Sequence, residues 1–312
     1  MTGGWHGLLL VDKPAGPTSH DVVDVVRRLT GQRRAGHAGT LDPAATGLLP
    51  IVLGCATRLV RFLPASPKVY QGILVLGLTT ETDDVSGAVL ERHAGALPAP
   101  GAVAAAAGAL EGSQLQLPPA YSARKLGGER MYRLARRGAR AIGAARPIEV
   151  HDFRVEATGQ ADRFRFEVTV TAGTYVRALV RDLGRKLGCG AALAALRRTR
   201  IGSMAVEDAL ALSGAGSAER LAPALVAPER MPLLPPPHRL DDDELARSFC
   251  GGASIDPPGL ELAGPVAVYD PAGRLLGIGE SAAGRLRPRV VVAAPPVPPR
   301  GAAGRSGPGA SG

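Results

Sequence analysis

The chain has 312 residues, of which 45% are hydrophobic and only 4% aromatic, and its formal net charge is +9. This length accommodates one large domain and a small one, at roughly 100–200 residues per domain. The sequence contains no apolar run near the roughly 20 residues of a transmembrane helix and no signal-peptide pattern, so we expect a soluble, cytoplasmic protein that does not bind membranes.

The cysteines and the glycine-rich segments offer no cofactor site. Cys55, Cys189 and Cys250 are far apart, form no C-x-x-C pair and have no histidine placed to complete a zinc site. We expect buried thiols in a reducing compartment. Because no phosphate-binding glycine motif follows a strand pattern either, the sequence predicts chemistry without a metal or a nucleotide cofactor.

The positive charge is concentrated in residues 121–200, which hold 18 Arg and Lys against 7 Asp and Glu, a net charge of +11. The rest of the chain has a net charge of −2. Such a segment is typical of a surface that binds nucleic acid, although a solvated basic face is the alternative. Arginine predominates there, which suits forked contacts to phosphate.

The N-terminal region predicts a strand and a helix. Residues 7–11 are a short apolar run that ends in a loop at 12–14. Thr18 and Asp21 have the spacing of a capping box before a helix whose apolar residues repeat at helical spacing until Gly31. A second apolar run covers 48–53.

Between that helix and the second apolar run lies GHAGTLDPAATGLLP (36–50), which has one carboxylate, Asp42. Taken alone, Asp42 followed by Pro43 fits a helix N-cap, with the proline in the first turn. Most isolated loop aspartates have such structural roles. This interpretation competes with a functional one that the rest of the chain supplies.

The middle of the chain predicts further strands and helices. Residues 68–77 are typical of a strand with Tyr70 on one buried face, and the polar turn 79–84 lacks the calcium-loop pattern, so we interpret it as structural. We expect a connection and a helix over 94–110. A loop at 118–125 precedes an expected basic helix over 131–140.

Residues 163–170 alternate strictly between apolar and polar side chains, which predicts a strand with one packed face. A helix follows residues 172–174, with its core stripe at Val176, Leu179, Val180, Leu183 and Leu187. Arg177, Arg181 and Arg185 recur every four residues on another face, so we do not expect Arg177 to be a mere core filler.

Three domains follow from these patterns. We expect a catalytic domain over 1–232, which ends at the proline-rich linker 231–237. Residues 233–294 predict a small β module, in which a DPAG turn joins the strands 265–269 and 274–278, and 288–292 form another strand. The glycine- and proline-rich residues 295–312 predict a disordered tail.

Five segments, in this order, resemble the TruB family of bacterial tRNA pseudouridine synthases: GLLLVDKPAGPTSHDVV (7–23), GHAGTLDPAATGLLP (36–50), KVYQGILVLGLTTETDD (68–84), PPAYSARKLGGERMYRLARRG (118–138) and GTYVRALVRDLGRKLGCGAALAALRR (173–198). The resemblance covers nearly all of 7–200. It implies an α+β catalytic domain with a mixed sheet, followed by a small C-terminal β module that resembles a reduced RNA-binding module of the PUA type. Glu81 stands where the family often has aspartate.

The family's reaction isomerises uridine 55 in the T-loop of tRNA, without cofactor or metal. It breaks the N-glycosidic bond, rotates the base and rejoins it through carbon 5. The resemblance identifies Asp42 as the catalytic carboxylate, which acts either as a nucleophile on C1′ or as a base on C2′. Arg177 matches the arginine that pairs with this aspartate, and its alternative role is phosphate contact. Tyr70 matches the tyrosine that stacks on the target base, and its alternative role is to fill a strand face.

The remaining site residues follow from the same motifs. His37 matches the histidine that occupies the space of the extruded nucleotide, and its alternative role is to cap a backbone group. Leu196 matches an apolar residue beside the pocket, and its alternative role is ordinary core packing. Lys13 and Tyr175 match positions that support the pocket. Candidates for phosphate contacts are Arg124, Lys125, Arg133, Arg136 and Arg137.

The resemblance implies that the T-arm of tRNA is the partner, and we expect a monomer with no obligate protein partner. Two other functions stay open. One is a tRNA-folding chaperone that binds RNA without needing the reaction. The other is a pseudouridine synthase with another RNA target, such as the guide-RNA-dependent relatives.

Overall fold

The structure is a computed structural model that describes residues 4–119, 125–126, 129–130, 144–212 and 217–293. The chain divides into two compact units, Met1–Pro232 and Leu233–Gly312. No helix in the described ranges is both long enough and apolar enough to span a membrane. The expected basic helix over 131–140 and the expected disordered tail lie outside the described residues.

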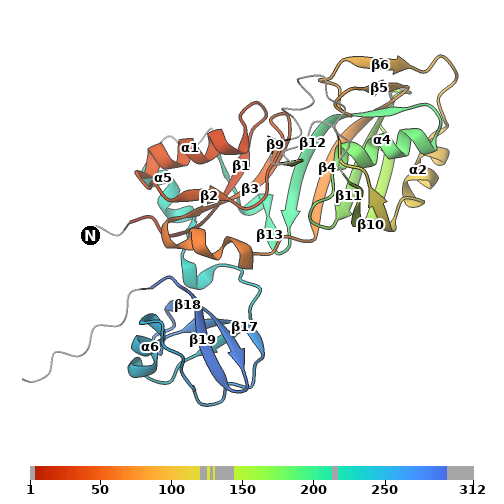
Figure 1. The fold of residues 1–312 in the computed structure, drawn as a ribbon. Coiled ribbons are helices and arrows are strands. Elements are labelled where there is room, and N and C mark those ends of the chain that lie inside the picture. The colour runs from red at the N-terminus through yellow and green to blue at the C-terminus, as the bar shows by residue number, and fades with distance from the viewer. Residues whose placement is uncertain (1–3, 120–124, 127–128, 131–143, 213–216, 294–312) are drawn as a thin grey trace, which may run out of the picture. The chain divides into compact units, whose positions relative to one another are not determined.

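A large mixed sheet forms the frame of the first unit (Figure 1). Its main path, among the described residues, has the order β14-β1-β3-β12-β4-β11-β10-β7, with β2 on β3, β13 on β12 and β15 on β1. The strands are β1 (Gly7–Lys13), β2 (Ala35–His37), β3 (Thr46–Leu53), β4 (Lys68–Leu76), β7 (Gly112–Gln116), β10 (Arg146–Ala157), β11 (Arg163–Val170), β12 (Ala191–Ile201), β13 (Met204–Ala205), β14 (Leu210–Ala211) and β15 (Leu225–Val226).

Two pairs in this sheet are parallel, β12 with β3 and β1 with β14, and the others are antiparallel. The two-stranded pairs β5 (Leu78–Thr80) with β6 (Val89–Arg92) and β8 (Lys125–Leu126) with β9 (Glu129–Arg130) lie outside it. The mixed sheet and the small C-terminal β module confirm the predicted α+β class.

The helices cover the two halves of this sheet separately. In Figure 1, α1 (Ser19–Thr30) lies with the β1–β3 half, whereas α2 (Pro100–Gly108) and α4 (Val176–Lys186) lie with the half formed by β4, β10 and β11. The described part of this unit also has the short helices α5 (Ala218–Leu221) and η1 (Gly54–Phe62) and single turns at 206–208, 222–224 and 228–230. In the middle of the sheet, β12 separates β3 from β4, and α4 also packs against β12.

The local sequence explains why these elements form. Thr18 and Asp21 make the predicted capping box at the start of α1, and Gly31 ends the helix in the left-handed conformation, at φ 66°. In β11, Phe164, Phe166, Val168 and Val170 are buried while the intervening residues are more exposed, as the alternation predicts. The predicted strands at β1 and β4 and the core stripe of α4 are confirmed.

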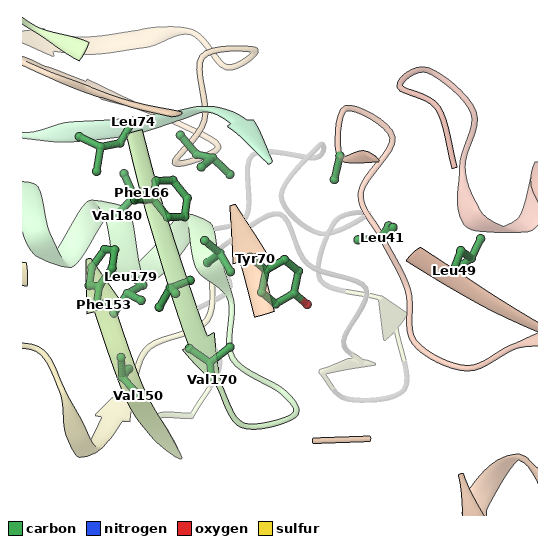
Figure 2. Close-up of a cluster of buried hydrophobic side chains, with 14 of the residues drawn as sticks. Leu41, Leu49, Tyr70, Leu74, Val150, Phe153, Phe166, Val170, Leu179 and Val180 are labelled. Carbon is green, nitrogen blue, oxygen red and sulfur yellow. The ribbon is translucent and has the colours of Figure 1, made fainter. Parts of the chain in front are cut away.

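The main core packs between the sheet and its helices. In Figure 2, Leu74, Phe166, Leu179 and Val180 lie together where α4 covers the sheet. Tyr70 lies at the margin of this cluster, and its hydroxyl points away from it. The Tyr70 hydroxyl is therefore a polar group at the margin of the core, on β4, which is the strand next to β12.

The second unit has a sheet in the order β16-β17-β18-β19, formed by β16 (Pro237–Arg239), β17 (Gly264–Tyr269), β18 (Leu275–Ala282) and β19 (Arg285–Val291). The predicted hairpin turn is present: the amides of Gly273 and Arg274 donate to the Asp270 carbonyl and carboxylate, at 2.9 and 2.8 Å. The helix α6 (Asp243–Cys250), which we did not predict, packs Ala246 and Phe249 into this unit's core.

Two sequence interpretations need correction. Asp42 is not a helix N-cap, because a tight turn at 43–44 leads directly into the strand β3. The cysteines are free as expected, but only Cys189 is fully buried, while Cys55 and Cys250 are partly exposed. Partial burial nevertheless raises the pKa of both partly exposed thiols.

Gly72 provides a test of the packing at the centre of the sheet. Its neighbours on the adjacent strands are Phe166 and Leu196, and an added Cβ would overlap the Phe166 ring and the Ala195 carbonyl. We therefore expect Gly72→Ala to lower the free energy of unfolding by about 1–3 kcal/mol. Chemical denaturation of the purified variant measures this change.

Gly101→Ala in α2 is the matched control, because a Cβ there would have no described atom within 4 Å. Alanine has the higher helix propensity, by about 1 kcal/mol at most, so the control should not lose stability. Equal losses in the two variants would contradict the packing described for β4.

Candidate active site

The loop that carries Asp42 is fixed by hydrogen bonds from the N-terminal elements. Ser19, at the start of α1, donates to the Leu41 carbonyl at 3.0 Å and accepts from the Leu41 amide at 2.9 Å. The Ala45 amide donates to the Asp42 carbonyl at 3.1 Å, which closes the turn. Asp42 therefore sits on a backbone that tertiary contacts hold in place.

Lys13 also supports this loop. Its side chain is fully buried at the end of β1, and its ammonium donates to the carbonyls of Pro14, Pro17 and Pro43 at 2.8, 2.8 and 3.0 Å. Burial lowers the pKa of Lys13, while the charges of Asp42 and Asp21 act in the opposite direction. Lys13 thus contacts the backbone beneath Asp42 and does not line the pocket described below.

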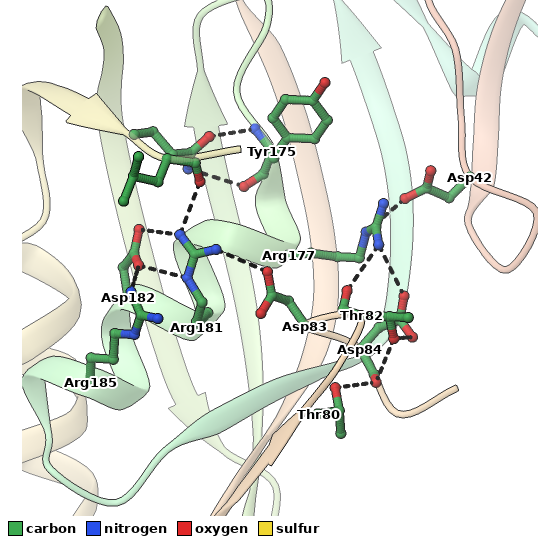
Figure 3. Close-up of polar contacts among 12 residues, drawn as sticks. Asp42, Thr80, Thr82, Asp83, Asp84, Tyr175, Arg177, Arg181, Asp182 and Arg185 are labelled. Atoms are coloured by element: carbon green, nitrogen blue, oxygen red, sulfur yellow. Dashed lines mark hydrogen bonds and ion pairs between the residues drawn. The ribbon is translucent and has the colours of Figure 1, made fainter. Parts of the chain in front are cut away.

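Arg177 joins three segments of the chain at one guanidinium (Figure 3). Its Nε lies 2.9 Å from the Asp42 carboxylate, and its Nη1 donates to the Thr82 carbonyl at 2.9 Å and lies 3.5 Å from the Asp84 carboxylate. The Arg177 side chain is 9% exposed, whereas that of Asp42 is 49% exposed. The ion pair therefore has a buried cation and an anion that still faces solvent.

The turn at 82–84, which contacts Arg177, is itself fixed by hydrogen bonds. The Asp84 carboxylate accepts from the Thr82 hydroxyl at 2.8 Å and from the Ser86 amide at 3.0 Å. The turn is tied to β12, because the Leu193 amide donates to the Asp83 carbonyl at 3.1 Å. This polar turn, which the sequence indicated to be structural, thus orients the arginine.

Arg181 lies one helical turn after Arg177 and contacts the same turn at 82–84. Its Nη1 lies 3.0 Å from the Asp83 carboxylate, and its Nη2 donates to the Leu117 carbonyl at 3.0 Å. Asp83 adopts a left-handed backbone with φ at 61°. Burial raises the pKa of the Asp83 carboxyl, and the positive charge of Arg181 opposes that shift.

A pocket of about 240 Å³ opens beside Asp42, and its walls come from both halves of the sheet. The structure brings five of the predicted site residues to it: Asp42, Tyr70, Tyr175, Arg177 and Leu196. Tyr70 is only 6% exposed. Tyr175 precedes α4, and its backbone is fixed by Gln116, whose side-chain amide donates to its carbonyl at 3.1 Å and accepts from its amide at 2.8 Å.

Three cations at this site, Arg198, Lys68 and Arg146, were missed by the sequence analysis. Arg198 is completely buried and donates to the carbonyls of Leu48, Gly39 and Thr40 at 2.8, 3.0 and 3.3 Å. Lys68 lines the pocket, and burial lowers its pKa to about 8, with the charge of Arg198 acting in the same direction. Lys68 lies two residues before Tyr70 in the same predicted strand, so the period of two was the signal that could have found it.

The other predicted site residues lie elsewhere. His37, in β2, does not line the pocket; within the described residues its buried Nδ1 has no hydrogen-bond partner, and burial lowers its pKa. Only the backbone of Lys125 is described, in β8. Arg124, Arg133, Arg136 and Arg137 lie outside the described residues.

This arrangement can carry out acid–base or nucleophilic chemistry. A partly exposed carboxylate is paired on one side with a buried guanidinium, and its other side faces a pocket with an aromatic wall at Tyr70. Across the part of the chain that the structure describes, no group of three or more His, Cys, Asp or Glu residues could hold a metal ion.

Comparison with protein families gives three matches. Residues 27–176 match the TruB family pseudouridylate synthase (N terminal domain). Residues 177–214 match the tRNA pseudouridylate synthase B C-terminal domain. In the second unit, residues 236–292 match the family described as pseudouridine synthase II TruB, C-terminal.

Curated relatives match over most of the chain. The tRNA pseudouridine synthase B of Thermobifida fusca (strain YX) is 44% identical over 294 residues, which cover 92% of this chain and 98% of the relative. The protein of the same name from Acaryochloris marina (strain MBIC 11017) is 40% identical over 296 residues, which cover 92% of this chain and 99% of the relative.

Solved structures share the fold. The structure of an H/ACA RNP bound to a substrate RNA containing 2′-deoxyuridine matches with a TM-score of 0.65 and 25% identity, over 89% of this chain and 78% of that chain. A Cbf5-Nop10-Gar1 complex matches with a TM-score of 0.64 and 26% identity, over the same shares of the two chains.

Removal of Arg181 tests how the turn at 82–84 is held. We expect Arg181→Met to lower the free energy of unfolding at pH 7 by about 1–3 kcal/mol, because it leaves the Asp83 carboxylate buried without its cation. The pKa of folded Asp83 then rises further above its unfolded value. The variant therefore loses stability as the pH rises through that pKa, so its deficit is larger at pH 7 than at pH 4 in denaturant titrations.

Two comparisons sharpen this test. Adding Asp83→Asn to Arg181→Met should recover part of the loss, since the uncompensated charge is gone. Arg185→Met, on the same helix, removes a side chain that is 65% exposed and 3.7 Å from Asp182, and should change stability little. A deficit that does not depend on pH would contradict the role given to Arg181.

Proposed function

The chain belongs to the TruB family of pseudouridylate synthases and is an isomerase that acts on tRNA, and we propose that it converts uridine 55 of the T-loop to pseudouridine with Asp42 as the catalytic carboxylate. The observation that carries this proposal is the pair of Asp42 and Arg177 at the wall of a pocket that Tyr70 and Leu196 also line. The curated relatives named tRNA pseudouridine synthase B support tRNA as the substrate.

The proposed reaction breaks the bond between N1 of uracil and C1′ of the ribose, turns the base, and joins C5 to C1′. C5 loses its proton and N1 gains one, so substrate and product are isomers and no co-reactant is consumed. One carboxylate suffices at the sugar, either as a nucleophile on C1′ or as a base on C2′. A half-exposed carboxylate beside a pocket fits either route.

Arg177 is proposed to keep Asp42 charged and oriented. Its guanidinium cannot lose its proton at physiological pH, and its remaining contacts to Thr82 and Asp84 fix its direction. The proposed role of Tyr70 is to stack on the target base and to accept or relay the C5 proton. Leu196 supplies an apolar contact beside the base, and Tyr175 and Lys13 support the walls of the pocket.

The remaining assignments concern RNA outside the reacting base. We assign to His37 the space vacated by the extruded nucleotide, although it lies outside the pocket lining. Phosphate contacts are assigned to Arg124, Lys125, Arg133, Arg136 and Arg137. The proposal includes recognition of the T-arm by a monomer, with residues 233–294 as a PUA-like RNA-binding module.

Two alternatives remain as outcomes of the test. A tRNA-folding chaperone would bind RNA without needing the reaction. The hypothesis of an RNA target other than tRNA is supported by the similar H/ACA structure, whose description names a bound substrate RNA. The curated relatives cover 92% of this chain and bear the name of a tRNA enzyme, which favours tRNA.

We expect Asp42→Asn to abolish pseudouridine formation while RNA affinity changes less than about three-fold, because the amide cannot act as nucleophile or base. The measurement is carbodiimide mapping of an unmodified tRNA transcript after incubation without metal or nucleotide. The wild-type protein should give a stop at position 55 of the T-loop that is absent with the variant.

Asp24→Asn is the matched control, since the Asp24 carboxylate lies on α1 and is 50% exposed. It should retain the full stop. If the wild-type protein binds the transcript but leaves no stop, the result favours the chaperone function. A stop at another position would show that uridine 55 is not the target.

Tyr70→Phe separates the two roles proposed for the tyrosine. The ring remains, so the dissociation constant of the RNA should change less than about three-fold. If the hydroxyl relays the C5 proton, the single-turnover rate falls by about 100-fold or more. A variant with the wild-type rate would leave stacking as the whole contribution of Tyr70.

A further inference from the structure

Lys68 is a pocket cation without a partner among the described residues. It begins β4 on the same face as Tyr70 and lines the same pocket as Asp42. Within the described ranges, no carboxylate or carbonyl accepts a hydrogen bond from its ammonium. Lys13 differs, because three backbone carbonyls accept from it.

A second buried cation stands beside Lys68. An added Cβ at Gly39 would lie 3.6 Å from the Lys68 Nζ and 3.5 Å from the Arg198 Nη1, so both cations approach the same point of the chain. The guanidinium of Arg198 is already occupied by three carbonyls. Lys68 is therefore the cation of this pair that is open to the pocket.

The charges that line the pocket do not cancel. Lys68, Arg146 and Arg177 are positive, and Asp42, which is paired with Arg177, is negative. The described lining thus has a net charge of +2 and includes two cations, Lys68 and Arg146, without a carboxylate partner among the described residues. A desolvated cation is costly unless an anion compensates it.

We propose that the Lys68 ammonium binds a phosphate of the RNA backbone next to the target nucleotide. This inference rests on the proposed function, because RNA is the polyanion that would enter the pocket. A phosphate supplies the negative charge that the lining lacks, whereas a uracil carbonyl is neutral and would leave the excess uncompensated. Lys68 would then help to seat the nucleotide whose sugar faces Asp42.

The charged and titratable groups around Lys68 come from every element at the pocket. They are Asp42, Tyr70, Arg146, Tyr175, Arg177 and Arg198. His37 lies near Arg198, and burial lowers its pKa below 6.5, so it is neutral above pH 7. Burial lowers the pKa of Lys68 to about 8, so its ammonium loses most of its proton between pH 7 and 8.5.

The first test measures RNA binding as a function of salt for Lys68→Met. All proteins carry Asp42→Asn, so that bound RNA stays unreacted, and the probe is a synthetic T-arm stem-loop. We expect binding about 10-fold weaker near 0.1 M salt. The slope of log affinity against log salt should fall by about 0.7–0.9, the value for one phosphate contact.

Lys186→Met is the matched control, because Lys186 is exposed at the end of α4 and away from the pocket lining. It should leave both affinity and slope unchanged. If Lys68→Met weakens binding without changing the slope, the ammonium contacts a neutral group such as a uracil oxygen, and the phosphate proposal is overturned. An unchanged affinity overturns it as well.

The second test replaces the phosphates on either side of the target uridine by methylphosphonates, one at a time. One of these neutral linkages should weaken binding to the Lys68 protein by about 10-fold. The same linkage should then cost the Lys68→Met protein nothing further, because the contact is already lost. Additive losses at both linkages would show that Lys68 contacts neither phosphate.

The third test uses pH. If the charged ammonium binds the phosphate and loss of its charge costs about 10-fold, affinity should fall about three-fold between pH 7 and 8.5, given a pKa of about 8 in the free protein. Lys68→Arg, which stays charged, and Lys68→Met, which has no charge, should both show a flat profile. Lys68→Arg keeps the charge and a long side chain, so the comparison of its pH profile with that of the Lys68 protein decides the question even if Lys68→Met fails to fold.

These measurements are separable from the test of the proposed function. Pseudouridine at position 55 with no effect of Lys68→Met would overturn only the phosphate contact. A lysine-dependent salt slope without any pseudouridine would overturn only the assigned reaction.

Discussion

The structure depends on one guanidinium. Arg177 is almost completely buried at the start of α4 and contacts Asp42 in the loop before β3 and both Thr82 and Asp84 in the turn after β5. These segments are far apart in sequence and come from a helix, a loop that leads into the large sheet and the turn of the separate pair β5–β6. Because a buried arginine without acceptors is costly, the three segments are held in one arrangement, and that arrangement places a half-exposed carboxylate at the pocket.

The surrounding framework explains why this pair can be precise. Lys13 and Ser19 fix the backbone of the Asp42 loop, and Arg181 fixes Asp83 at the back of the opposing turn. Both sets of contacts are largely buried, so water competes with them weakly. A site between two separately covered halves of a sheet needs such anchors, since a loop alone would leave the carboxylate poorly oriented.

The sequence predicted the elements whose patterns are local. The capping box of α1, the alternation of β11 and the stripe of α4 each specify their own structure. It did not predict β12, although β12 lies at the centre of the sheet, because the run AALAALRR has high helix propensity and becomes a strand only between β3 and β4. In the site, motifs predicted Asp42, Tyr70 and Arg177, which the structure brings to one pocket, whereas the proximity of Lys68 to Arg198 depends on strands that are distant in sequence.

The two kinds of cation at the pocket follow from opposite physical requirements. Arg177 and Arg198 are fully occupied by protein oxygens, so their charges stabilise one conformation of the chain and change little when a ligand arrives. Lys68 lines the pocket without a described acceptor, and burial lowers its pKa, so an incoming anion would offset the cost of its partial desolvation. A pocket that must exclude water around a reacting sugar and still attract a polyanion needs both. Arg177 orients the carboxylate and Arg198 holds the backbone of its loop before binding, and the lysine makes the affinity for the pocket depend on the charge of what enters it.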